Sequence, residues 1–93
     1  MTEPEVGVVA VSRAGHDKGH AFVILGREGD EYVLLADGRN RKAGKPKKKK
    51  LRHVHIEPAV AESVRETLLS GRTPTDAQLR TALTILGYRA DTE

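Results

Sequence analysis

The sequence predicts a mainly β protein, in which a small and strongly bent sheet or barrel is followed by two short helices. Two features support this fold class. In residues 6–56, short apolar runs alternate with glycine-containing turns, which is the pattern of short strands joined by hairpins. In residues 57–88, apolar residues instead recur at spacings of three and four, which is typical of amphipathic helices.

Four strands are expected in the first part of the chain. They are residues 6–13, 20–26, 31–36 and 52–56. In the last of these, Val54 and Ile56 alternate with histidines, as in a strand with one apolar face. Residues 22–25 are apolar on both faces of a strand. We therefore expect one face of the sheet to fill the interior of the barrel and the other to lie beneath another element.

Two helices are expected to provide this cover. The first should begin at Pro58 and end at Gly71, because proline favours the first turn of a helix and glycine its end. The second should begin with Thr73 as N-cap and Pro74 in its first turn, followed by an apolar stripe over residues 79–86. The helices should fold back on the barrel or on each other.

These elements predict a simple domain organisation. Residues 6–56 form the barrel, within which residues 39–52 are a basic loop. Residues 57–88 form a two-helix extension. Residues 1–5 and 89–93 are expected to be disordered, because chain ends fray when nothing ties them down.

Charge is distributed unevenly along the chain, whose net charge is +3. Residues 39–52 hold nine Lys/Arg and no acid, whereas residues 1–38 carry −4 and residues 53–93 carry −2. Such a cationic block indicates a polyanionic partner, with nucleic acid ahead of an anionic membrane surface. A solvated charge run and a nuclear localisation signal are the alternative interpretations of "PKKKK". Because strands are expected at both ends of the block, we favour a phosphate-binding surface.

Several function classes have little support. The chain has no cysteine, so disulfides and thiolate metal sites are excluded. No apolar run approaches the ~20 residues of a membrane span, and the acidic N-terminus lacks the basic region of a secretory signal. The four histidines have few acids nearby and no thiolates, so we expect no metal and no cofactor. The serines lack a recognisable base partner, so we expect no enzyme activity.

The segment "GHDKG" (15–19) lies between the first two expected strands. Its glycines allow a sharp reversal, and Lys18 at the tip could reach a phosphate. At these residues the chain resembles the KOW motif of ribosomal proteins and transcription-elongation factors. With "VLLADGRNRK" (33–42) and the basic stretch ending at "LRHV", it is similar to bacterial KOW-domain RNA-binding proteins. These are akin to a KOW-containing ribosomal protein of the archaeal and eukaryotic large subunit.

The resemblance covers residues 6–56 well and the tail "TDAQLRTALTILG" loosely. It implies an SH3-like barrel that binds structured RNA. We therefore expect a cytoplasmic RNA-binding protein with a role in translation, either ribosome-associated or rRNA-binding, that is a monomer when free. Ribosomal proteins are further expected partners. The chain has only three aromatic residues, one Phe and two Tyr. Recognition should therefore rely on phosphates and on RNA shape rather than on base stacking.

The expected RNA contacts are mostly the cations of the basic block. They are Lys18, Arg39, Arg41, Lys42, Lys45, Lys47, Lys48, Lys49, Lys50 and Arg52, with Arg13, His16, His53 and His55 as secondary contacts. Gly15, Gly19 and Gly38 should shape the loops. The alternative function is a protein-interaction module of the SH3-like type, docking through its barrel or through the apolar stripe of the second helix. A DNA-binding or membrane-surface protein would use the same basic block.

Overall fold

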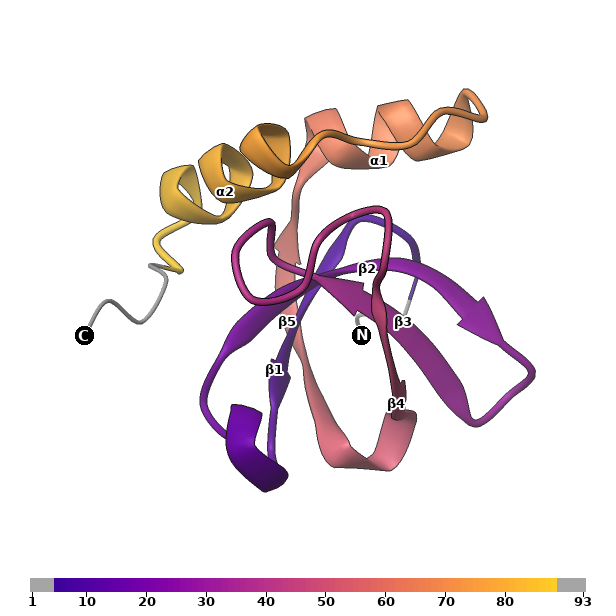
Figure 1. Cartoon of the computed structure of the whole chain (residues 1–93), viewed down its shortest axis with the longest axis vertical. Coiled ribbons are helices and arrows are strands. Elements are labelled where there is room, and N and C mark those ends of the chain that lie inside the picture. Colours follow the sequence, from indigo (N-terminus) through magenta and orange to yellow (C-terminus); the bar gives the residue numbers. More distant parts are fainter. Residues whose placement is uncertain (1–4, 89–93) are drawn as a thin grey trace.

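The computed structural model describes residues 5–88 and shows a five-stranded antiparallel sheet followed by two helices (Figure 1). The predicted mainly β fold with two C-terminal helices is confirmed. The elements are β1 (Val8–Ser12), the 3-10 turn η1 (Gly15–Asp17), β2 (Ala21–Glu28), β3 (Tyr32–Ala36), β4 (Lys47–Lys50), the 3-10 turn η2 (Leu51–His53), β5 (Val54–Val60), α1 (Glu62–Leu69) and α2 (Asp76–Ile85). The expected disorder of residues 1–5 and 89–93 lies outside the described residues, except for Glu5, which forms an ion pair with Arg65.

The sheet is curled on itself. Its strand order is β4-β3-β2-β1-β5, so β4 and β5 are its two edges. These edges are joined by the three residues of η2. Because so short a connection cannot cross a flat sheet of five strands spaced about 4.8 Å apart, the sheet must bend until its edges approach each other at this corner. The expected small, strongly bent sheet is therefore present.

Two separate apolar cores lie on the two faces of the curled sheet. The inner core contains Phe22, Ile24 and Leu35, all fully buried. The outer core contains Val9 and Val23 from the sheet, and it is completed by Ala61 and Val64 from the segment around α1 and by Leu79, Ala82 and Leu83 from α2. Since side chains alternate along a strand, the doubly apolar β2 supplies residues to both cores. The expected cover over the second face is thus the helix pair.

The apolar stripe of α2 is buried by this packing. Leu79, Ala82 and Leu83 are buried in the outer core. The stripe expected as a docking surface is therefore unavailable to a partner while the helix is packed. Ile85 and Leu69 are the large apolar side chains that remain exposed among the described residues, and scattered residues of this kind are normal on a protein surface.

The basic block is not the continuous loop that the sequence predicted. Lys47–Lys50 form β4, which pairs antiparallel with β3, from Leu35 opposite Lys47 to Tyr32 opposite Lys50. No apolar residue marks this strand, so the alternation that identifies strands was missing. The position explains how four lysines can form a strand, because an edge strand needs only one neighbour and lysines there discourage pairing with another chain.

Pro58 lies within β5 and does not begin the first helix. Proline is tolerated there because β5 is an edge strand and its pairing with β1 is irregular between Val8 and Ala10. The helix α1 begins four residues later, at Glu62. The expected boundary between barrel and extension at residue 57 therefore falls inside the last strand.

The second helix also begins later than predicted. Its N-cap is Thr75 and not Thr73. The Thr75 hydroxyl accepts a hydrogen bond from the backbone N–H of Gln78 at 3.0 Å, and the Gln78 side-chain oxygen accepts one from the Thr75 N–H at 3.4 Å. This capping box satisfies two otherwise unpaired donors. A side-chain acceptor at Thr75 with glutamine three residues later outweighs the preference of Pro74 for a first turn.

Candidate nucleic-acid interface

The four lysines of β4 point alternately into and away from the curled sheet. Lys47 and Lys49 stand opposite Leu35 and Val33, both buried in the inner core. Residues directly opposite each other in an antiparallel pair share a face, so these two lysines face the interior. Lys48, between them, points to the outer side. The lysine run is therefore two rows of side chains with different environments.

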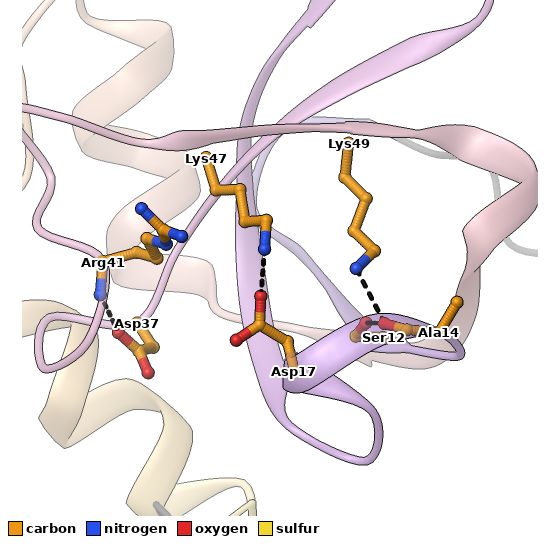
Figure 2. Close-up of polar contacts among 7 residues, drawn as sticks. All are labelled: Ser12, Ala14, Asp17, Asp37, Arg41, Lys47 and Lys49. Atoms are coloured by element: carbon orange, nitrogen blue, oxygen red, sulfur yellow. Dashed lines mark hydrogen bonds and ion pairs between the residues drawn. The ribbon is translucent and has the colours of Figure 1, made fainter.

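Lys49 is almost fully buried, with 9% of its surface exposed. Its ammonium group donates a hydrogen bond to the carbonyl oxygen of Ala14 at 3.0 Å (Figure 2). The aliphatic stem of a lysine can extend an apolar core while its charged end reaches a polar partner. Lys49 therefore ties the edge strand β4 to the segment that leads into η1, and it is not positioned to contact RNA.

Lys47 makes a second link between the same two segments. Its ammonium group donates to the Asp17 carboxylate and forms an ion pair with it (Figure 2). The hydrogen bond from Lys47 holds the pKa of Asp17 below its ordinary value, and the positive charges of Lys47, Lys49 and Arg41 act in the same direction, against the opposing effect of burial. One carboxylate thus lies within the field of three cations, which leaves this region positively charged.

The outward side of β4 is closer to charge balance. The Lys48 ammonium group lies 2.8 Å from the Glu28 carboxylate and 4.6 Å from the centre of the Tyr32 ring. The hydrogen bond with Glu28 raises the pKa of Lys48. Next to this pair, a pocket at the corner of the sheet is lined by Asp30, Glu31, Lys50, Leu51 and Arg52. Acids and bases are equal in number there, so this side favours a polyanion less.

The exposed positive charge is concentrated on the loop between β3 and β4. Asp37 is buried, and its Oδ1 accepts hydrogen bonds from the backbone N–H groups of Arg39 and Arg41, both at 2.9 Å. Gly38 follows with a φ of 80°, a conformation that favours glycine. The backbone of this turn is thereby fixed by its own side chain. The exposed cationic side chains that it carries are those of Arg39, Arg41, Lys42 and Lys45.

The same loop rests on the second helix. The Ala43 N–H donates to Asp76 Oδ1 at 2.7 Å, and Arg80 Nη1 donates to the Gly38 carbonyl oxygen at 2.8 Å. Asp76 is the first residue of α2 and Arg80 lies one turn later. Neither contact was predictable from the sequence, because no local pattern reveals a contact between residues as far apart as Ala43 and Asp76, which are separated by 33 positions.

The expected RNA contacts therefore differ in accessibility. Those with exposed side chains are Arg13, His16, Lys18, Arg39, Arg41, Lys42, Lys45, Lys48, Arg52 and His55. Lys47, Lys50 and His53 are half-buried, and Lys49 is buried. Gly15, Gly19 and Gly38 all have positive φ, as sharp loops require. Within residues 5–88, no group of three or more His, Cys, Asp or Glu side chains is placed to hold a metal ion.

Comparison with known proteins does not place the chain in a family. No protein-family model matches the chain, and no curated protein matches it either. Among residues 5–88, none of the helices has the length and apolar character needed to cross a membrane.

Proposed function

We propose that this protein binds folded RNA through the loop between β3 and β4, as a cytoplasmic, ribosome-associated or rRNA-binding protein and not as an enzyme. The observation that supports this most is that four exposed cations, Arg39, Arg41, Lys42 and Lys45, share one loop whose backbone is fixed by Asp37. A fixed array of cations suits a fixed array of phosphates, because little ordering remains to be done on binding. The KOW resemblance supports the same conclusion.

Lys18 extends this surface onto the neighbouring loop. It is exposed and follows Asp17, which is paired with Lys47 from β4 and lies within the field of Arg41. The η1 loop and the β3–β4 loop therefore contribute to one positively charged region. Arginine in this region can bind phosphate with two parallel hydrogen bonds, whereas lysine binds as a point charge. Contacts of both kinds recognise backbone and shape, not base sequence.

The proposal is tested by measuring affinity for ribosomal RNA fragments at several salt concentrations. Lys45→Ala and Arg41→Ala should each weaken binding and reduce the slope of log affinity against log salt by about one. Arg72→Ala is the matched control, because Arg72 is exposed but lies between the two helices. Duplex DNA and anionic vesicles serve as competitors and should displace RNA poorly. Absence of binding, or a steep slope that no substitution in the loop changes, would refute RNA binding through this loop.

A further inference from the structure

The basic loop between β3 and β4 is attached to α2 at two points. Near its start, the Gly38 carbonyl oxygen accepts a hydrogen bond from Arg80 at 2.8 Å. Near its end, the Ala43 N–H donates to Asp76 Oδ1 at 2.7 Å. Ala43 is itself buried in the outer core with the apolar side chains of α2. Both attachment points are backbone groups of the loop, so α2 fixes the path of its backbone and leaves its side chains free.

Gly38 shows how closely the loop and the helix approach. A Cβ atom at this position would lie 2.3 Å from the Asp76 carbonyl oxygen and 3.0 Å from the Arg80 side chain. Real Cβ atoms do not approach a backbone oxygen so closely, so any other residue would force the loop away from the helix. Gly44, at the other end of the loop, has no atom within 4 Å of such a Cβ and no positive φ. The close contact is thus specific to the Gly38 side.

Three of the exposed cations lie between these two attachment points, namely Arg39, Arg41 and Lys42. We propose that α2 is the positioning element of the RNA-binding loop and that Asp76 is a positioning residue for RNA binding, although it is itself an acid. This inference rests on the proposed function. A loop whose backbone is already ordered loses less conformational freedom when it meets a phosphate backbone, so its release from α2 should lower affinity.

Because Asp76 is negatively charged, the direction in which its removal changes RNA affinity tests the proposal. By simple electrostatics, removal of an acid beside a basic loop should strengthen the binding of a polyanion. If Asp76 acts through its hydrogen bond to Ala43, removal of the acceptor should weaken binding instead. Asp76→Asn and Asp76→Ala remove the same charge, but only asparagine retains an oxygen that can accept from the Ala43 N–H. The two variants therefore separate charge from positioning.

The experiment measures affinity of the whole chain for one ribosomal RNA fragment at fixed salt. Asp76→Ala should bind about three- to tenfold more weakly than Asp76→Asn, as expected for the added ordering of one or two loop residues. Glu66→Ala, which removes an exposed acid from α1, should bind as tightly as the wild type or more tightly. Amide hydrogen exchange should show loss of protection at Ala43 in Asp76→Ala and retention in Asp76→Asn.

A second pair of variants changes no charge. Gly38→Ala should bind RNA more weakly than Gly29→Ala, which also places alanine at a positive φ but lies outside the loop and should match the wild type. This pair keeps the test decisive if Asp76→Ala does not fold, as judged by circular dichroism. Equal affinities within each pair, with wild-type RNA binding intact, would overturn the positioning role and leave the proposed function standing. Failure of the wild type to bind RNA would overturn the proposed function and this inference together.

Discussion

The Lys49 ammonium group on β4 donates a hydrogen bond to the Ala14 carbonyl oxygen, just before η1, at 3.0 Å. Lys47 and Asp17 form an ion pair beside it. Two lysines from the most basic segment of the chain thus connect the edge strand β4 to the segment around η1. Some lysines of the run therefore form contacts inside the protein, whereas others remain exposed. Substitutions of individual lysines should consequently have different effects.

Lys49→Ala should destabilise the protein by about 1–3 kcal/mol, because it removes a buried aliphatic stem and leaves the Ala14 carbonyl oxygen without this donor. Lys48→Ala is the control, since Lys48 lies next along the same strand and its pair with Glu28 is exposed. Its cost should be much smaller, because a solvent-exposed ion pair contributes little to stability. Urea unfolding of both variants measures the difference. Equal losses of unfolding free energy would contradict a special structural role for Lys49.

Acid should weaken the link between Asp17 and Lys47. The pKa of Asp17 is lowered in the folded protein, chiefly by its hydrogen bond from Lys47. A lowered pKa means that the folded state favours the ionised carboxylate. The resulting stability is fully present above the unfolded value of about 3.9 and is lost as pH falls through the lower folded value. Urea unfolding at a series of pH values, from neutral pH down to below the unfolded value, should show this loss.

Asp17→Asn is the matched variant for that measurement. It should be less stable than the wild type at neutral pH, and its stability should fall less steeply in acid because residue 17 no longer titrates. Asp30→Asn removes an exposed acid at the β2–β3 turn and serves as control, with a pH profile close to that of the wild type. Parallel acid profiles for wild type and Asp17→Asn would show that Asp17 does not contribute to acid sensitivity.

The strands and helices that carry apolar residues were predictable from the sequence, because buried positions recur along each element with the period of a strand or a helix. The doubly apolar run around Phe22 and Val23 predicted correctly that both faces of the sheet are covered. The lysine strand could not be predicted from the same signal. Its pairing with β3 is held by backbone hydrogen bonds, and its inward face is filled by the stems of Lys47 and Lys49, which hydropathy counts as polar.

The candidate interface was predictable as a charge pattern and not as a set of contacts. The absence of acids from residues 39–52 was visible in the sequence, as was the turn signal at Asp37 and Gly38. The partners that fix or neutralise the block come from elsewhere in the chain. Asp17 lies 30 positions from Lys47, and Asp76 lies 33 positions from Ala43. Such pairings depend on tertiary structure, so composition alone overestimates the number of free cations.

Gly7 should be required for docking of the first helix onto the sheet. Its φ is 88°, and a Cβ there would lie 2.5 Å from the Arg65 Cβ on α1. Gly29 also has a positive φ, but a Cβ there would meet nothing within 4 Å. Alanine at either site carries the left-handed backbone cost of about 1–2 kcal/mol, and Gly7→Ala adds overpacking of about 1–3 kcal/mol. Thermal unfolding that places the two variants together would contradict this contact.

Tyr88 should connect the end of the second helix to β5, and the loss of this connection at high pH should be measurable. Its hydroxyl donates to Glu57 Oε1 at 2.7 Å, and burial together with this hydrogen bond raises the pKa of Tyr88 to about 12. The folded state thus favours the neutral hydroxyl. The stabilisation is fully present below the unfolded value of about 10 and is lost as pH rises through about 12.

Ultraviolet absorbance of tyrosinate measures this titration, and Tyr32→Phe isolates the signal of Tyr88, since the chain has two tyrosines. Tyr88→Phe keeps the ring against the outer core but removes the donor, so it should cost about 1 kcal/mol at neutral pH. It should also lose less stability than the wild type above pH 10, because phenylalanine does not titrate. Titration of Tyr88 near 10 in the folded protein would mean that the hydrogen bond to Glu57 does not hold the end of α2 against β5.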